Sequence, residues 1–252
     1  MSSEAVVHLS VVIPAFEEAG RLDRTLRRGR VYLDGQSFSS EVLVVVDGGG
    51  DGTLEIARKW ETDWSTLRVL DNKVNQGKGF AVRCGMLVSR GRYLLFSDAD
   101  LSTPIDQVER LLVALEAGGD VAIGSRALAG SDVRVRQAWW RELMGRLFNR
   151  VVRLIALSDV RDTQCGFKCF RRDAGRQIFA RQRIWRFSFD VELLWIARKL
   201  GYRVTEVPVT WVNDPSSRVH PLRDSLRMLV DLVRVRYNDL RGVYQFGEGP
   251  SV

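Results

Sequence analysis

A run of five aliphatic residues at positions 42–46 constrains the fold of this chain more than any other feature of its sequence. No polar residue interrupts the run, which reads VLVVV, so a strand formed here would be apolar on both faces. Strands of that kind belong to parallel sheets that helices cover on both sides. The sequence therefore predicts a buried parallel sheet.

Short apolar runs alternate with amphipathic stretches through the first half of the chain. Strands are predicted at 10–13 (ended by Pro14), 42–46, 68–70, 93–97 and 120–124, and helices at 17–30, 53–60, 79–90 and 105–117. This alternation predicts an α/β fold with a Rossmann-like, mostly parallel sheet flanked by helices. The length of 252 residues and the hydrophobic content of 45% favour one large domain.

Charged side chains that are candidates for a site follow four of the five predicted strands, close to the point where each of the four ends. Because ligands bind outside the carboxyl ends of such strands, we expect these side chains to form a site. The residues concerned are Glu17, Asp47, Asp98, Asp100 and Arg126. The sequence therefore predicts a site with three acidic clusters and one cation at a single edge of the sheet.

Asp98 and Asp100 lie one residue apart directly after a buried strand. Side chains alternate in an extended segment, so both carboxylates can face the same way. Two convergent carboxylates suit Mg²⁺ or Mn²⁺, which completes its shell with water and substrate phosphates. A structural interpretation also fits, in which Asp98 caps a turn and Asp100 begins the next helix. The residues alone leave both interpretations open.

Residues 75–79, NQGKG, form a glycine-flanked loop at the start of a predicted helix. Backbone amides in such a loop, together with Lys78, suit a diphosphate. The spacing is not that of a P-loop NTPase. An ordinary turn with a solvated lysine is the alternative.

Seven motifs resemble, in order, those of family 2 glycosyltransferases of GT-A fold. They lie at 11–18, 44–53, 75–86, 96–104, 122–126, 162–170 and 189–194. The block DTQCGFKCF at 162–170 is most similar to the branch of dolichyl-phosphate β-glucosyltransferases and bacterial polyprenyl-phosphate relatives. The resemblance implies an inverting, metal-dependent enzyme that moves a hexose from a nucleotide sugar, with UDP-glucose favoured, to a polyprenyl or dolichyl phosphate.

The resemblance also implies roles for residues of the donor site. Those that it places around the base and ribose are Pro14, Phe16, Glu17 and Asp47. Asp98 would lie near the ribose or diphosphate and share the metal site with Asp100, while Lys78 would lie close to the donor. The family often has a second aspartate at the position of Val46 and a polar pair at Gly49-Gly50. This departure leaves the choice between uridine and guanosine open.

Fewer residues are predicted for the acceptor site than for the donor site. The resemblance implies that Arg126 meets the acceptor phosphate and that Arg218 lies near the diphosphate. A phosphate monoester has a second pKa of about 6 and is mostly dianionic near pH 7, so an aspartate here can position the acceptor without deprotonating it. Asp162 is the first candidate for this catalytic aspartate and Asp190 the second. Their structural alternatives are a turn cap for Asp162 and a helix N-cap for Asp190.

Two stretches in the second half, 139–157 and 222–236, have the spacing of amphipathic helices. The second has an apolar stripe made of Leu222, Leu226, Leu229 and Val233. Eight arginines and three acidic residues give 126–161 a net charge of +5, out of +7 for the chain. Arginines attract anionic headgroups, and Trp139 and Trp140 suit a membrane interface. The alternative is that both helices pack on the sheet with solvated arginines.

Residues 1–10 lack the basic start and long apolar core of a signal peptide. The aliphatic run at 42–46 is also far shorter than the roughly 20 residues that cross a bilayer. We therefore expect a cytoplasmic protein that associates peripherally with the cytoplasmic face of the membrane. Within the single domain, 1–126 would bind the nucleotide sugar, 127–240 the acceptor and membrane, and 241–252 would form a tail.

The positive charge alone also suits a nucleic acid. However, the chain has no zinc-finger or RRM signature, so no nucleic-acid partner is predicted. Three alternatives to the main hypothesis remain: a soluble glycan or protein acceptor, a UDP-N-acetylhexosamine or GDP-mannose donor, and an inactive subunit that only binds a sugar nucleotide.

Overall fold

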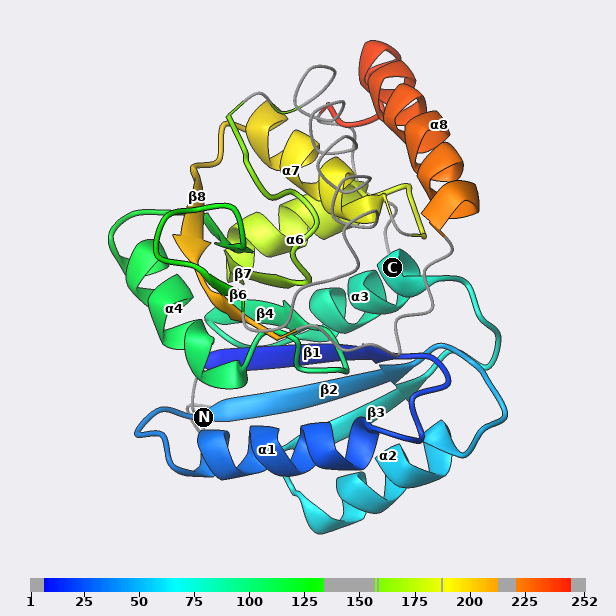
Figure 1. The fold of residues 1–252 in the computed structure, drawn as a ribbon, viewed down its shortest axis with the longest axis vertical. Helices are drawn as coiled ribbons and strands as arrows, with labels where there is room; N and C mark the ends of the chain where they lie inside the picture. The colour runs from blue at the N-terminus through cyan, green and yellow to red at the C-terminus, as the bar shows by residue number, and fades with distance from the viewer. Residues whose placement is uncertain (1–6, 134–156, 158, 187, 213–220, 246–252) are drawn as a thin grey trace, which may run out of the picture.

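A seven-stranded sheet forms the centre of the protein (Figure 1). The computed structural model describes residues 7–133, 157, 159–186, 188–212 and 221–245. Its strands are β1 (Leu9–Ala15), β2 (Ser40–Val46), β3 (Leu67–Asp71), β4 (Tyr93–Ser97), β5 (Val121–Ser125), β7 (Phe167–Arg171) and β8 (Val204–Pro208). They are arranged in the order β3-β2-β1-β4-β7-β5-β8. All neighbours are parallel except β7, which runs antiparallel to β4 and β5. The predicted mostly parallel sheet is therefore confirmed.

Helices cover both faces of this sheet. On one face lie α1 (Leu22–Asp34), α2 (Thr53–Asp63), the 3-10 turn η1 (Ile105–Gln107) and α4 (Val108–Glu116). On the other lie α3 (Lys78–Val88), α6 (Arg172–Arg181) and α7 (Phe189–Lys199), with α8 (Pro221–Leu240) packed outside α7. Two short strands, β6 (Asp132–Val133) and β9 (Thr210–Trp211), pair with each other apart from the main sheet.

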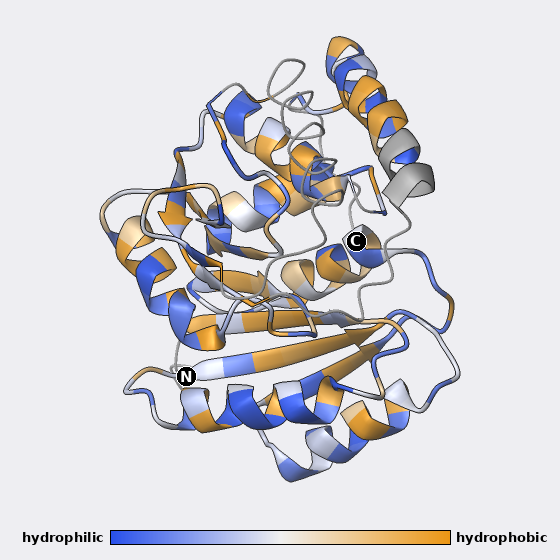
Figure 2. Cartoon of the chain, viewed as in Figure 1, coloured by the Kyte–Doolittle hydropathy of each residue, from blue (hydrophilic) through white to orange (hydrophobic). Residues whose placement is uncertain are grey.

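Alternation along β2 explains why its last five residues, 42–46, are all apolar. Val42, Val44 and Val46 face the core under α1 and α2. Leu43 and Val45 face the core under α3. Figure 2 shows β2 coloured as hydrophobic along most of its length. Both faces of the strand are buried, as the aliphatic run predicts.

Of the predicted boundaries that differ from the structure, two flank the segment that follows β1. The first strand does not end at Pro14 but continues to Ala15. Its pairing with β4 stops at Val12, so the missing N–H of Pro14 costs no hydrogen bond on that side. The first helix begins at Leu22 and not at 17, because Glu17 has a φ of +52°, which is incompatible with a right-handed helix.

Several predicted features lie outside the described residues. These are Trp139, Trp140, Arg218 and nearly all of the amphipathic stretch 139–157.

Among the helices that the structure describes, none is long and apolar enough to span a membrane.

Candidate active site

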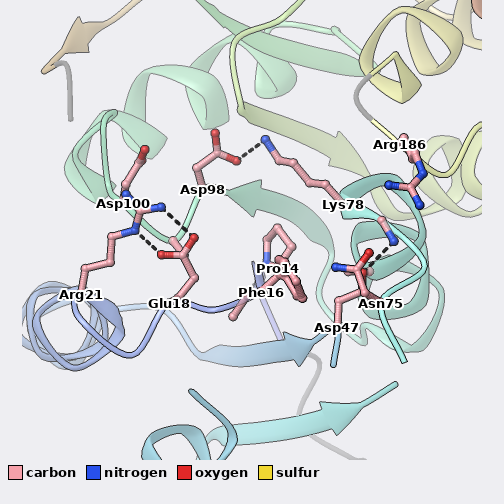
Figure 3. A pocket seen from close by; sticks show the side chains of 14 residues that line it. Pro14, Phe16, Glu18, Arg21, Asp47, Asn75, Lys78, Asp98, Asp100 and Arg186 are labelled. Carbon is pink, nitrogen blue, oxygen red and sulfur yellow. Dashed lines mark hydrogen bonds and ion pairs between the residues drawn. The ribbon is translucent and has the colours of Figure 1, made fainter. Parts of the chain in front are cut away.

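A pocket of about 560 Å³ opens at the carboxyl ends of β1, β2 and β4 (Figure 3). The predicted site residues that line it are Pro14, Phe16, Asp47, Lys78, Asp98 and Asp100. These come from four separate segments, and the sheet brings them together because its parallel strands end at one edge. Of the five charged residues that were predicted to converge, Asp47, Asp98 and Asp100 line this pocket, whereas Glu17 and Arg126 do not.

Asp98 and Lys78 form an ion pair in the pocket. Lys78 Nζ lies 2.6 Å from Asp98 Oδ1, so the lysine is not the solvated side chain of an ordinary turn. Burial alone would lower the pKa of Lys78, but the charges of Asp98 and Asp190 raise it, and the ammonium stays protonated. The Asp98 amide donates to the carbonyl of Gly166 at 3.2 Å. A Cβ on Gly166 would lie 2.1 Å from Asp98 Oδ2, so the carboxylate occupies space that only glycine leaves free.

Asp100 lies in a tight turn after β4. Its Oδ1 accepts a hydrogen bond from the Ser102 amide at 2.8 Å, and Leu101 between them has a φ of +49°, in the left-handed region. Helical structure begins only at Ile105, so the interpretation in which Asp100 begins a helix is wrong. Burial raises the pKa of Asp100, and the charge of Asp98 raises it further.

The two carboxylates fit a divalent cation of the Mg²⁺ or Mn²⁺ type. Both Asp98 and Asp100 line the pocket and repel each other, which a bound cation would relieve. The described part of the chain holds no group of three or more acidic, histidine or cysteine side chains around a cation position. A cation bound here would take its remaining ligands from water and substrate, as Mg²⁺ commonly does.

Asp47 shapes the glycine-flanked loop. Its Oδ2 accepts hydrogen bonds from the amides of Gln76 at 3.1 Å and Gly77 at 2.7 Å. Its Oδ1 accepts one from Asn72 Nδ2 at 3.0 Å. The side chain is buried, and both of its oxygens are already used within the protein. Asp47 therefore lines the predicted base and ribose site while it holds the loop that enters α3.

Glu17 does not line the pocket, whereas its neighbour Glu18 does. The left-handed backbone at Glu17 interrupts the alternation of β1 and turns this side chain towards Gly49. Glu18 forms an ion pair with Arg21, which lines the same pocket.

Arg126 and Asp162 form a second cluster, outside the residues that line the pocket. Asp162 accepts three hydrogen bonds from Arg126: from the amide at 2.9 Å, Nε at 2.7 Å and Nη2 at 2.8 Å. Burial would raise the pKa of Asp162, but the charge of Arg126 outweighs it and lowers that pKa. The guanidinium also lies 5.3 Å from the ring centre of Trp211. Asp162 therefore remains ionised and orients Arg126.

Asp190 is buried behind the pocket and does not line it. It lies in the first turn of α7, after Ser188 at the N-cap position, so the N-cap interpretation of Asp190 is wrong. Its carboxylate pairs with Lys168, whose Nζ also donates to the carbonyl of Cys165 at 2.7 Å. Lys168 has no exposed surface. This ion pair ties β7 to α7.

Arg186 also lines the pocket, although it belongs to none of the motifs described above. It comes from the loop between α6 and α7, which has no recognisable motif of its own. Its one sequence signal is its position three residues before the motif at 189–194.

The fold and the pocket are those of a nucleotide-sugar-dependent transferase, and the chain belongs to glycosyl transferase family 2, whose sequence model matches residues 10–179. It is 37% identical to a dolichyl-phosphate β-glucosyltransferase of Drosophila melanogaster over 252 residues, covering 95% of this chain and 77% of the relative. It is 34% identical to the Homo sapiens enzyme of the same name over 250 residues, covering 94% and 77%.

Solved structures show the same GT-A architecture at lower identity. Mannosyl-3-phosphoglycerate synthase from Rubrobacter xylanophilus aligns with a TM-score of 0.67 at 19% identity, over 98% of this chain and 78% of that one. Glucosyl-3-phosphoglycerate synthase from Mycobacterium tuberculosis, solved with Mn²⁺, UDP and its product, aligns with a TM-score of 0.66 at 20% identity, over 91% and 80%. The expected fold is confirmed.

Proposed function

We propose that this protein transfers glucose from UDP-glucose to a polyprenyl or dolichyl phosphate, with inversion at the anomeric carbon. The likeness to dolichyl-phosphate β-glucosyltransferases over about 95% of the chain carries this proposal. The pocket supports it, because two carboxylates and a lysine converge where a nucleoside diphosphate would need a cation and a positive charge.

Asp98 and Asp100 would hold Mg²⁺ or Mn²⁺ in the working enzyme. The Mn²⁺ in the structurally similar glucosyl-3-phosphoglycerate synthase supports this assignment. A bound cation would offset the negative charge that grows on the leaving diphosphate. Lys78, kept protonated by its acidic neighbours, adds a fixed positive charge beside it. Pro14 and Phe16 contribute an apolar wall for the nucleoside.

Arg126 is the proposed contact for the acceptor phosphate. Asp162 holds its guanidinium through two parallel hydrogen bonds, a geometry that fixes the plane of an arginine side chain. Because the carboxylate of Asp162 is already occupied and the phosphate is already mostly ionised, we assign Asp162 to positioning and not to proton transfer. The predicted roles of Glu17, Asp190 and Arg218 stay predictions.

We further propose that α8 contacts the cytoplasmic face of the membrane. Leu229 and Val233 of the predicted apolar stripe are exposed, Val233 at 64%, and do not pack on the sheet. Among the side chains of this helix that the structure describes (227–240), Val230, Tyr237 and Leu240 are also large, apolar and exposed. A helix that packs through one face and exposes apolar side chains beside arginines suits an anionic bilayer surface.

A lipid-transfer assay tests the proposed reaction. The purified protein would receive labelled UDP-glucose, a polyprenyl phosphate and Mg²⁺ or Mn²⁺, and label would be followed into organic solvent. We expect transfer that chelation abolishes and that Asp100→Asn lowers by about 1,000-fold or more, because the charge stabilisation by the cation is worth several kcal/mol.

Asp106→Asn serves as the matched control. Asp106 is exposed, lies six residues from Asp100 and does not line the pocket, so its variant should transfer like the wild type. Label that is bound or hydrolysed but never enters lipid would overturn the lipid acceptor and favour a soluble one. UDP-N-acetylhexosamine and GDP-mannose, run in parallel, would identify a different donor.

A further inference from the structure

Arg186 lines the pocket with a guanidinium group that pairs with no other described residue. Three cationic side chains of the described residues line the pocket: Arg21, Lys78 and Arg186. Arg21 pairs with Glu18, and Lys78 pairs with Asp98. The side chain of Arg186 makes no hydrogen bond or ion pair with any residue that the structure describes, and only its backbone carbonyl is used there, by the Phe189 amide at 3.3 Å. A guanidinium group offers five N–H donors and no acceptor, so a ligand in this part of the pocket meets unused donors.

The loop that carries Arg186 is fixed from both sides. Gln182 Nε2 donates to the carbonyls of Gly79 at 2.9 Å and Ile184 at 2.8 Å. The buried carboxylate of Glu192 accepts from the amides of Arg183 and Ile184, the latter at 2.7 Å. These bonds join the loop to the start of α3 and to α7.

Trp185 presses the end of this loop against α3, next to Arg186. Its carbonyl accepts a hydrogen bond from the Phe80 amide at 3.1 Å, and the two rings lie 4.6 Å apart. A Cβ on Gly77 would come within 2.5 Å of the same carbonyl, so the approach requires glycine. The backbone at Arg186 is thus held in place before any ligand binds, which lowers the entropic cost of a contact.

Figure 3 shows where this side chain lies in the pocket. Arg186 is at the end formed by Asn75 and Lys78, while Asp100 and Arg21 are at the opposite end. If the carboxylates hold the cation and the diphosphate, as proposed above, the nucleoside points towards Asn75 and Arg186. The base is therefore the part of the donor that an unused guanidinium at this end would meet.

We propose that Arg186 recognises the base of the donor by donating to a carbonyl oxygen of a uracil-type ring. Uracil has a carbonyl oxygen where cytosine has an amino group, and an amino group faced with a guanidinium would pair donor with donor. Arg186 would therefore favour UDP over CDP both by attraction and by exclusion. This inference rests on the proposed function, because it requires a nucleoside diphosphate in the pocket.

Binding of UDP and CDP, whose bases differ at this group and at the neighbouring ring nitrogen, tests the proposal. Affinities for UDP and CDP, each with Mg²⁺, would be measured by calorimetry for the wild type and Arg186→Ala. We expect the wild type to prefer UDP. The variant should lose about tenfold or more in UDP affinity, as for one charged hydrogen bond, while its CDP affinity changes little. Arg183→Ala, in the same loop but not lining the pocket, should bind like the wild type.

Three results would overturn the inference. Equal losses for UDP and CDP would mean that Arg186 contacts the phosphates or acts indirectly. An unchanged affinity of Arg186→Ala for UDP would mean that the Arg186 side chain contacts nothing on the nucleotide. A wild type that binds UDP and CDP equally well would contradict the proposed base selectivity. A wild type that binds neither nucleotide would instead contradict the proposed function, and so the two failures are distinguishable.

Discussion

Gly166 and Asp98 depend on each other at the scale of single residues. Gly166→Ala would place a Cβ 2.1 Å from the Asp98 carboxylate, which must then move away from its place in the pocket. We expect the transfer rate to fall by about 100-fold, as for a misplacement of roughly 1 Å in an active site. The unfolding free energy should fall by only about 0.5–1.5 kcal/mol, the cost of a shifted rotamer. The lipid-transfer assay and urea unfolding measure the two effects.

Gly29→Ala is the control for this variant. Gly29 lies in α1, where an added Cβ meets nothing within 4 Å, and alanine favours a helix interior over glycine. This variant should transfer at the wild-type rate with equal or higher stability. Wild-type activity in Gly166→Ala would show that the carboxylate position is not critical.

Single residues also show where prediction of the site from sequence stops. Asp98, Asp100 and Lys78 could be placed because they follow a strand or begin a helix, and such positions converge. Glu17 could not, because one left-handed residue interrupts the alternation and presents Glu18 in its place. Arg186 could not either, because hydrogen bonds from distant elements position its loop.

At the scale of elements, the buried Lys168–Asp190 pair joins β7 to α7. Lys168→Met would leave the carboxylate of Asp190 buried without its partner, so we expect a loss of about 3–5 kcal/mol in unfolding free energy. Adding Asp190→Leu removes this unpaired carboxylate, so the double variant should regain most of the lost unfolding free energy. Urea unfolding of the wild type and of both variants measures this.

The same double variant separates structure from catalysis. If Asp190 has the predicted catalytic role, the double variant should be folded yet inactive. Normal transfer by a folded double variant would leave Asp190 with a structural role alone. A double variant as unstable as the single one would show that packing around Lys168, and not the unpaired carboxylate, dominates the loss.

Glu41 fastens the start of β2 to its neighbours. Its side chain is 3% exposed and accepts hydrogen bonds from Ser10 Oγ at 2.7 Å and the Arg90 amide at 2.6 Å. Burial would raise the pKa of Glu41, but these bonds and the nearby arginines outweigh it and hold the pKa below its ordinary value of about 4.5. The stabilisation is therefore complete above the ordinary pKa and is lost as pH falls through the lower folded value.

Glu41→Gln should mimic the protonated side chain. We expect it to lower the unfolding free energy by about 1–3 kcal/mol at pH 7, with a difference from wild type that shrinks as pH falls below about 4.5. Urea unfolding of the wild type and of Glu41→Gln at several pH values from 7 to 3.5 measures this difference in unfolding free energy. Glu116→Gln, at an exposed glutamate in α4, should match the wild type throughout. A pH-independent difference would argue that the charge of Glu41 is irrelevant.

Elements differ in how far local sequence determines them. The predictions for β1 to β5 with their helices hold because each element has its own period and its neighbours follow closely in the chain. The strand β7 was not predicted. It enters the sheet between β4 and β5 in the opposite direction, about 70 residues after β4 in sequence. It also contains a buried lysine whose charge is balanced by the distant Asp190.

For the whole molecule, the ordered set of motifs predicted the family that the comparison confirms, over nearly the full chain. Which side of α8 is buried could not be predicted from the sequence. Helical spacing alone gives the same stripe to a helix that packs on a sheet and to one that faces a membrane. In the part of α8 whose side chains the structure describes, 227–240, Met228, Leu232 and Val235 are buried, while Leu229 and Val233 are exposed.

This orientation leads to a prediction about membrane binding. We expect the protein, with its formal charge of +7, to bind vesicles that contain anionic lipid and to release them as salt screens the charges. Val233→Asp should weaken binding by about tenfold or more, because it removes an apolar contact and adds a charge that the headgroups repel. Cosedimentation with vesicles at increasing salt measures both effects.

Val113→Asp provides a closely matched control. Val113 is exposed at 65%, against 64% for Val233, but it lies on α4, which covers the other face of the sheet (Figure 1). The two variants carry the same substitution at the same exposure, so a difference between them reports which side of the molecule meets the bilayer. Equal binding by both would place the contact elsewhere than α8. A loss confined to Val233→Asp would identify α8 as the surface through which the protein approaches the proposed lipid acceptor.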